Sequence, residues 1–189
     1  MKGTQLIFGT SNSNKLIEAK QILEPHGYKV EQYHVDLLEI QDSNLEKIAK
    51  ISLENLPEMH VNIFVEDTGL FIESLNGFPG PYASFVFKTI GNTGILKLLK
   101  NETNKKAYFE SYIAFKNNNG KIFTFQGKCE GEISNSLKGE KWGFDPIFIP
   151  YERNPEKLSF SELGNEIKND ISHRAKALHS FKDFLINSN

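Results

Sequence analysis

Apolar positions along the chain fall into two patterns, short runs typical of β-strands and longer stripes typical of helices. The strand-like runs lie at 6–8, 28–35, 61–65, 70–73, 107–115, 121–126, 129–134 and 146–149. Helical stripes, with apolar residues three or four positions apart, lie at 16–23, 45–56, 95–100 and 171–185. Strands and helices interleave early and an antiparallel hairpin comes late. This order predicts an α/β fold with a mixed sheet flanked by helices.

Turn and capping residues support these boundaries. Pro25 and Gly27 end the first helical stripe. Ser43 and Glu46 have the spacing of a capping box at the start of the second. The run Asn117–Gly120 predicts a hairpin turn. No repeat or linker interrupts the pattern, so the whole chain, residues 1–189, is predicted to be a single domain.

Charge and composition exclude several classes of function. The net charge is -2 and no Lys/Arg tract occurs, which argues against a general nucleic-acid-binding surface. Cys129 is the only cysteine, so an intramolecular disulfide or a cysteine-rich zinc site is impossible. No apolar run approaches the ~18 residues of a membrane span, and the N-terminus does not resemble a signal peptide. We therefore expect a cytoplasmic protein with no membrane or nucleic-acid partner.

Two adjacent carboxylates, Glu66 and Asp67, follow the apolar run at 61–65. Neighbouring strand residues point to opposite faces, so the two cannot share one hydrophobic core. A carboxylate at a strand end is well placed to bind a hard cation or to activate water. The stretch Asp36–Glu39 taken alone reads as a surface loop. Together with Glu66 and Asp67 it could complete a Mg²⁺ site, because Mg²⁺ takes only one or two carboxylates.

Three further segments carry polar groups that could bind a ligand. Thr10–Lys15, between a strand and a helix, is either a phosphate site or a helix cap followed by a solvated lysine. Trp142–Pro146 is either a stacking site for a planar base or a turn with core aromatics. Ser172–Arg174, with Lys168 one turn earlier, offers donors at the start of the last helix, although Ser172 could simply cap it. No Walker A loop, H-E-x-x-H zinc motif or G-x-S-x-G elbow is present.

Together these segments resemble the inosine triphosphate pyrophosphatase family, whose members hydrolyse noncanonical purine nucleoside triphosphates. Each block alone is weak, but the ordered set is highly specific and spans about residues 6 to 185. The matching blocks are Thr10-x-Asn12-x-x-Lys15, Glu66-Asp67-Thr68-Gly69-Leu70, Gly77-Phe78-Pro79-Gly80-Pro81-Tyr82, Gly143-Phe144-Asp145-Pro146-Ile147-Phe148 and Ser172-His173-Arg174. The third block is most similar to archaeal members.

The resemblance implies an elongated α/β fold of two lobes around a long mixed sheet, with the active-site cleft between the lobes. It implies a Mg²⁺-dependent attack of water on the α-phosphate of ITP, dITP or XTP, which yields the nucleoside monophosphate and pyrophosphate. It also implies a homodimer. No covalent intermediate is needed.

The resemblance further implies a role for each matching residue. Asp67 is the general base or a metal partner, Glu39 is the metal-binding acid, and Glu66 is a possible second acid. Thr68 binds substrate beside them. The phosphate ligands are Thr10, Asn12, Lys15, Lys50 and Lys168. The assignment of Lys50 crosses a one-residue length difference, so Lys47 could take its place.

Base recognition is expected to follow hydrogen-bond polarity. Inosine and xanthosine present a 6-oxo acceptor where adenine presents a donor. Donors from His173 and Arg174, with Ser172 in the same block, would pair with the oxo group and would be left unsatisfied by adenine. Phe144 would stack on the base and Asp145 would accept from its N1–H. Trp142 departs from the Phe usual before Gly143.

Two alternatives remain open. A relative of the septum-inhibitor type, acting on pyrimidine triphosphates, shares the fold, but the Ser172–Arg174 block argues against it. A non-catalytic nucleotide or single-stranded RNA binder is disfavoured by the mild acidity and the lack of a basic stripe.

Overall fold

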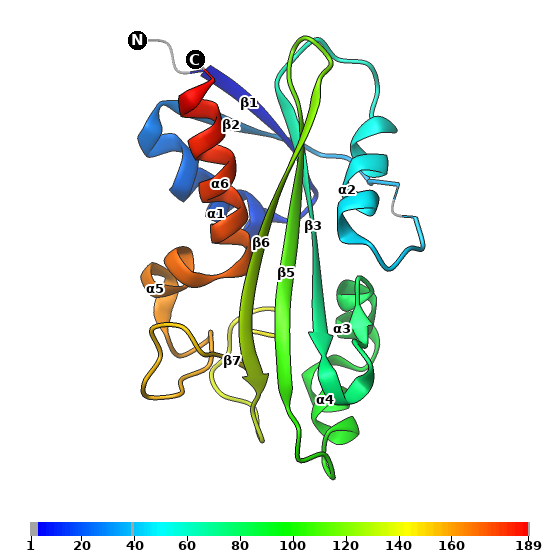
Figure 1. Cartoon of the computed structure of the whole chain (residues 1–189), viewed down its shortest axis with the longest axis vertical. Helices are drawn as coiled ribbons and strands as arrows, with labels where there is room; N and C mark the ends of the chain where they lie inside the picture. The colour runs from blue at the N-terminus through cyan, green and yellow to red at the C-terminus, as the bar shows by residue number, and fades with distance from the viewer. Residues whose placement is uncertain (1–3, 39, 189) are drawn as a thin grey trace. The chain divides into compact units, whose positions relative to one another are not determined.

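A computed structural model of the chain describes residues 4–38 and 40–188 (Figure 1). The strands in the described residues are β1 Thr4–Gly9, β2 Tyr28–Tyr33, β3 Ile63–Ile72, β4 Pro79–Gly80, β5 Lys106–Lys116, β6 Ile122–Ile133 and β7 Phe148–Pro150. The α-helices there are α1 Ser13–Leu23, α2 Leu45–Glu54, α3 Ala83–Thr89, α4 Gly91–Leu98, α5 Gly164–Ile171 and α6 His173–Asn187. None of the helices in these ranges is both long and apolar enough to cross a membrane.

The strands form one mixed sheet in the order β2-β1-β3-β5-β6-β7, with the short β4 paired to β3. β1 is parallel to both β2 and β3, whereas β4 and β7 run antiparallel to β3 and β6. The predicted α/β class with a mixed sheet flanked by helices is therefore confirmed.

Contacts divide the chain into two compact units. Unit 1 comprises Met1–Asp67, Ser111–Gly127 and Arg174–Asn189, and unit 2 comprises Thr68–Glu110 and Lys128–His173. Strands β3, β5 and β6 contribute residues to both units. The predictions of a single domain and of a cleft between two lobes stay predictions.

In unit 1 the sheet carries helices on both faces. Phe64 of β3 packs in one buried cluster with residues of α1 and α6, and those two helices lie side by side (Figure 1). Its strand neighbours Ile63 and Val65 pack in a second cluster with Ala49 and Leu53 of α2. This alternation along β3 assigns even-numbered residues to the α1–α6 face and odd-numbered residues to the α2 face.

Unit 2 has a buried core of its own. Leu70 and Ile72 of β3 and Phe109 of β5 share one cluster with residues of α3 and α4 and with the segment 144–148. Gly69 lies directly against this packing, because an added Cβ there would come within 2.6 Å of the Phe71 ring and 2.9 Å of the Gly80 carbonyl oxygen.

Two predicted strand breaks are wrong. β3 continues through the expected end at Val65, and β6 continues through the expected gap between 126 and 129. In β3 the buried carboxylate of Glu66 does not end the strand because basic and hydroxyl groups compensate it. In β6 every second residue from Gly127 to Ile133 is buried, so the period-2 pattern is unbroken by the glycine. The last strand, β7, begins two residues later than predicted.

The helices also depart from the sequence pattern. No apolar stripe predicts α3 or α5, both of which are short. The last helix begins at His173 because Ser172 is extended, with ψ 157°, and separates α5 from α6. Lys168 therefore lies on α5 and not on the first turn of α6.

The predicted capping box before α2 is also wrong. Asn44 caps the helix, since its side chain accepts a hydrogen bond from the Lys47 backbone N–H at 3.0 Å. Glu46 instead accepts from Lys50 at 2.7 Å and from Thr124 at 2.9 Å. The hairpin turn at 117–120 is confirmed, with the Gly120 N–H donating to the Asn117 carbonyl at 2.9 Å.

Candidate active site

The turn between β1 and α1 and the first turn of α1 hold three of the predicted phosphate ligands, Thr10, Asn12 and Lys15. The Oδ1 atom of Asn12 caps α1 by accepting from the backbone N–H groups of Asn14 at 2.9 Å and Lys15 at 3.3 Å. The Thr10 hydroxyl oxygen accepts from the Asn12 N–H at 3.1 Å. The capping role that the sequence left open is therefore present. The side-chain oxygens of Asn12 and Thr10 act as acceptors in this capping. Donors to a phosphate would therefore come from the Asn12 amide nitrogen and the Thr10 hydroxyl.

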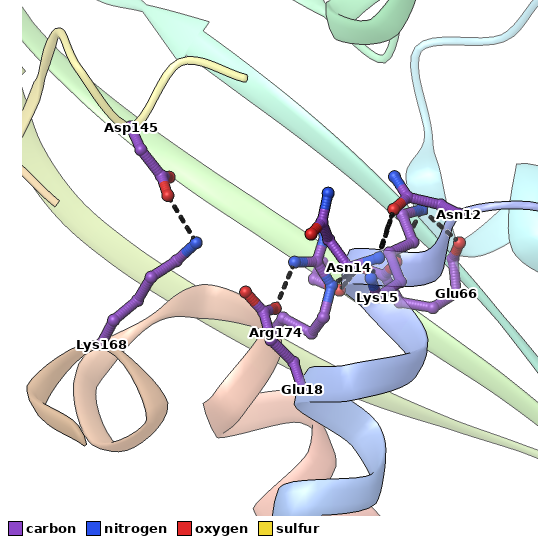
Figure 2. Close-up of polar contacts among 9 residues, drawn as sticks. Asn12, Asn14, Lys15, Glu18, Glu66, Asp145, Lys168 and Arg174 are labelled. Atoms are coloured by element: carbon purple, nitrogen blue, oxygen red, sulfur yellow. Dashed lines mark hydrogen bonds and ion pairs between the residues drawn. The ribbon is translucent and has the colours of Figure 1, made fainter. Parts of the chain in front are cut away.

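A cluster of four charged residues lies behind this turn in unit 1 (Figure 2). The Lys15 ammonium contacts Glu66 twice, at 2.7 Å from Oε2 and at 3.0 Å from the backbone oxygen. The Arg174 Nε lies 3.3 Å from Oε1 of Glu66, and its Nη1 lies 2.6 Å from Oε2 of Glu18. The formal charges of the four residues sum to zero.

The four members come from three elements, and the central pair, Glu66 and Arg174, is buried. Lys15 and Glu18 lie three positions apart on α1, and so share one helix face. Glu66 is on the α1–α6 face of β3, and Arg174 is the second residue of α6. Glu66 and Arg174 are only 5% and 3% exposed, and the buried Ser111 of β5 donates its hydroxyl to Oε1 of Glu66. These contacts explain how a carboxylate can be buried in the sheet.

The cluster fixes the protonation states of its central pair. Burial by itself raises the pKa of Glu66, but the charges of Arg174 and Lys15 outweigh burial and hold that pKa well below its ordinary value. Burial lowers the pKa of Arg174, and the charges of Glu66 and Glu18 outweigh it and raise that pKa. Glu66 is therefore an ionised carboxylate in the folded protein at neutral pH.

This depressed pKa predicts acid lability. Because the pKa of Glu66 is lower in the folded than in the unfolded chain, its stabilising contribution is complete above the ordinary value of 4.5. The contribution is lost progressively as the pH falls below that value. Urea unfolding between pH 7 and pH 3 should show a falling free energy of unfolding, with a shallower fall in Glu66→Gln. Equal slopes in the two proteins would contradict the assignment.

Asp67 and Thr68 follow Glu66 on β3 and are half-buried. The alternation along β3 places Asp67 on the face that α2 covers in unit 1, opposite the charged cluster. The expectation that Glu66 and Asp67 point to opposite faces of the sheet agrees with this alternation and stays a prediction. Their roles as base, metal ligand and substrate contact stay predictions.

The predicted Mg²⁺ ligands are only partly within the described residues. Glu39 lies outside them. Within residues 4–38 and 40–188, no three His, Cys, Asp or Glu side chains gather closely enough to hold a metal. A half-buried carboxylate such as Asp67 suits Mg²⁺, which takes one or two carboxylates and completes its shell with waters and phosphate oxygens. Lys50, the remaining predicted ligand on α2, pairs with Glu46 at 2.7 Å.

In unit 2 the structure pairs two predicted substrate ligands with each other. The Lys168 ammonium of α5 lies 2.6 Å from Oδ2 of Asp145, and both side chains are buried (Figure 2). The same ammonium lies 5.2 Å from the centre of the Trp142 ring and 5.8 Å from that of Phe160. Trp142 is 37% exposed. Lys168 is therefore held by one carboxylate and two aromatic faces.

The other predicted base contacts are also buried in unit 2. The Phe144 ring meets Phe87 edge-on at 5.4 Å and belongs to the core cluster, as the alternative reading of that turn expected. The His173 ring stacks on Phe109 with centres 4.5 Å apart. Ser172 ends α5, and its N–H donates to the Lys168 carbonyl at 3.0 Å.

A double-mutant cycle should detect the buried pair of unit 2. We expect Asp145→Asn and Lys168→Met to be coupled by about 2 kcal/mol in urea unfolding, because each variant leaves a buried charge without its partner. The exposed pair Lys20–Glu24, at 4.0 Å, is the control and should show much weaker coupling. A coupling as small as the control's would mean that Asp145 and Lys168 do not interact strongly.

Sequence reasoning missed one member of the charged cluster, Glu18, and the neutral residue Ser111 that contacts the cluster. Glu18 could have been found, because it lies three positions after Lys15 on a predicted helix and so shares its face. Ser111 has no such signal, since its contact with Glu66 joins strands far apart in the sequence.

A groove of about 900 Å³ in unit 2 lies among residues other than those predicted. Its lining includes four lysines, Lys100, Lys105, Lys106 and Lys138, and two acids, Glu102 and Glu132. None of the predicted site residues lines it, so the groove gives no support to the nucleotide-binding assignment.

Comparison with known proteins covers nearly the whole chain. The sequence profile of the Ham1 family matches residues 6–184. A protein of Methanopyrus kandleri named dITP/XTP pyrophosphatase is 46% identical over 97% of both chains. One of the same name from Thermococcus kodakarensis is 43% identical over 96% of this chain and 97% of its own length.

Solved structures agree with the sequence matches. The Staphylococcus aureus Ham1 protein superposes with a TM-score of 0.82 at 25% identity, covering 98% of this chain and 100% of that one. A HAM1 protein of Coxiella burnetii gives a TM-score of 0.83 at 26% identity, covering 97% of this chain and 99% of that one. The resemblance read from the five sequence blocks is thus confirmed, and the chain belongs to the Ham1 family.

Proposed function

We propose that the chain hydrolyses noncanonical purine nucleoside triphosphates, such as ITP, dITP and XTP, to the nucleoside monophosphate and pyrophosphate. The observation that carries the proposal is the match over 97% of the chain to a protein named dITP/XTP pyrophosphatase. The clustered Lys15, Glu66 and Arg174 support it, since they belong to the blocks from which the family was identified.

The phosphates would be bound at the start of α1. Lys15 supplies an ammonium there, and Thr10 and Asn12 supply neutral donors beside the positive end of the helix. Such charge-assisted hydrogen bonds are the stronger class of phosphate contact. Lys50 and Lys168 are the further cationic ligands in this proposal, and Thr68 contacts the substrate next to Asp67.

Asp67 is the proposed general base, which takes a proton from the water that attacks the α-phosphate. Its side chain is half-buried, and the alternation along β3 assigns it to the face opposite Glu66. Asp67 and Glu39 would hold Mg²⁺. When bound, Mg²⁺ neutralises charge on the phosphates and lowers the pKa of a coordinated water.

Base selection rests on residues of α5, α6 and the turn at 142–146. Donors from Arg174 and His173 would meet a 6-oxo group, and adenine would leave them unsatisfied. Asp145 is paired with Lys168, so Lys168 and the N1–H of the base would have to share that carboxylate. Trp142, the more exposed aromatic, is better placed than the buried Phe144 to offer a stacking face.

We further propose, from the family resemblance, that the protein is a homodimer that acts on the cytoplasmic nucleotide pool. Sedimentation equilibrium tests the first part: a mass of twice 21.5 kDa is expected, and a monomer at all concentrations would refute it.

A substrate panel tests the proposed reaction. Pyrophosphate release should be measured from ITP, XTP, dITP, GTP, ATP and UTP, each with Mg²⁺ and with EDTA. We expect Mg²⁺-dependent release from ITP, XTP and dITP that greatly exceeds release from ATP. Turnover of UTP alone would favour a pyrimidine-specific enzyme, and binding without turnover would favour a non-catalytic nucleotide binder. Either outcome would refute the proposal.

A further inference from the structure

The carboxylate of Glu66 is surrounded by basic and hydroxyl groups of the protein itself. Oε2 contacts the Lys15 ammonium at 2.7 Å, and Oε1 receives the Ser111 hydroxyl and lies 3.3 Å from Arg174 Nε. The backbone oxygen of Glu66 also accepts from Lys15, at 3.0 Å. A carboxylate has about four acceptor positions. Lys15, Ser111 and Arg174, from three different elements, already contact the two carboxylate oxygens, and the side chain is 1% exposed.

The contacts of Glu66 restrict Lys15 in particular. A lysine side chain is flexible, and its ammonium carries three N–H donors. Lys15 donates a hydrogen bond to the backbone oxygen of Glu66 and forms an ion pair with its carboxylate, and these two contacts restrict the position of the nitrogen. Lys15 is 19% exposed and so remains reachable from solvent.

Arg174 is oriented by the same carboxylate. Its Nε faces Glu66 and its Nη1 faces Glu18, so two acids on different elements fix the plane of the guanidinium. One face of α1 and the second residue of α6 are thereby tied to one point on β3. Ordering these long side chains before a ligand arrives removes an entropy cost from binding.

We propose that Glu66 is a positioning residue, which holds Lys15 and Arg174 ready for the nucleotide, and that Ser111 holds Glu66 in place. Glu66 does not bind the metal or transfer a proton. The inference rests on the proposed function for the identity of the ligand, whereas the ordering of Lys15 is a property of the protein without ligand.

Steady-state kinetics on ITP with Mg²⁺ separate positioning from catalysis. Glu66→Gln keeps the shape and removes the charge, and Ser111→Ala keeps every charge and removes one donor. We expect KM to rise about 30-fold in the first and about 5-fold in the second, with kcat within about 3-fold of wild type. The Mg²⁺ concentration for half-maximal rate should not change. Two matched controls should leave KM unchanged. Glu31→Gln removes a charge from an exposed ion pair, and Ser159→Ala removes a serine hydroxyl in unit 2.

Ser111→Ala decides the matter if Glu66→Gln fails to fold. An unchanged KM in folded Ser111→Ala would overturn the positioning role. So would a large fall in kcat, by about 100-fold or more, or a shifted Mg²⁺ requirement, in folded Glu66→Gln, because each would make Glu66 part of the chemistry. A wild-type protein that hydrolyses none of the nucleotides would refute the proposed function alone.

The second readout needs no nucleotide. In protein labelled with ¹⁵N-lysine, we expect an ammonium signal of Lys15, identified by its loss in Lys15→Arg, that is protected from exchange with water. That signal should broaden in Ser111→Ala and vanish in Glu66→Gln, and it should persist in Ser159→Ala. An unaltered Lys15 signal in both cluster variants would overturn the inference whatever the enzyme hydrolyses.

Discussion

Asp67→Asn is expected to lower kcat for ITP hydrolysis by about 10³-fold, which is the usual range for loss of a positioned proton acceptor combined with a metal ligand. The amide has the shape of the carboxylate but cannot accept the proton of the attacking water. Asp67 is half-buried, and the alternation along β3 assigns it to the face opposite the buried ion cluster, so we expect the variant to fold.

The effect on folding is the control for Asp67→Asn. The free energy of unfolding should stay within about 1 kcal/mol of wild type, as for most substitutions outside a packed core. Asp183→Asn, on an exposed carboxylate of α6, should change neither rate nor stability. A folded Asp67→Asn protein that turns over ITP at close to the wild-type rate would remove Asp67 from the mechanism.

Arg174→Ala should lower the free energy of unfolding by about 3–5 kcal/mol, the cost of removing one partner from a buried ion pair. Arg174 is 3% exposed and contacts both Glu66 and Glu18. Without it, the buried Glu66 keeps only Lys15 and Ser111 among the partners described above. The variant is therefore predicted to lose stability as well as affinity for ITP.

The chain offers a matched control in its other arginine, Arg153. Arg153 and its partner Asp170 are 61% and 54% exposed, so Arg153→Ala should change the free energy of unfolding by no more than about 0.5 kcal/mol. Urea unfolding at neutral pH measures both variants. Equal losses of the free energy of unfolding in the two variants would show that the charged cluster of Lys15, Glu18, Glu66 and Arg174 does not stabilise the fold.

Local patterns in the sequence predict most of the fold. The apolar stripe of α2 and the hairpin turn at 117–120 follow from helical periodicity and turn chemistry, which act over a few residues. The long strands β3 and β6 were each predicted as two pieces. Glu66 looked like a strand end, because its compensation by Lys15 and Arg174 comes from residues that only the tertiary fold brings near.

The candidate site, like the fold, could be predicted from the sequence only in part. Ordered motif blocks locate Asp67, Lys15 and Arg174, but say nothing of whether these side chains bond to one another. Ser111 is invisible to sequence reasoning because a serine on an aromatic-rich strand has no distinctive pattern. The pairing of Asp145 with Lys168 likewise depends on where α5 packs, and the sequence did not predict α5 as a separate helix.

The most direct test of the account is hydrolysis of ITP in H₂¹⁸O with Mg²⁺, with the products analysed by ³¹P NMR and mass spectrometry. Attack of water on the α-phosphate predicts that one ¹⁸O atom enters IMP and that the released pyrophosphate carries none. Label in the pyrophosphate, or release of inorganic phosphate in its place, would contradict the assignment of this chain as a nucleoside triphosphate pyrophosphatase of that mechanism.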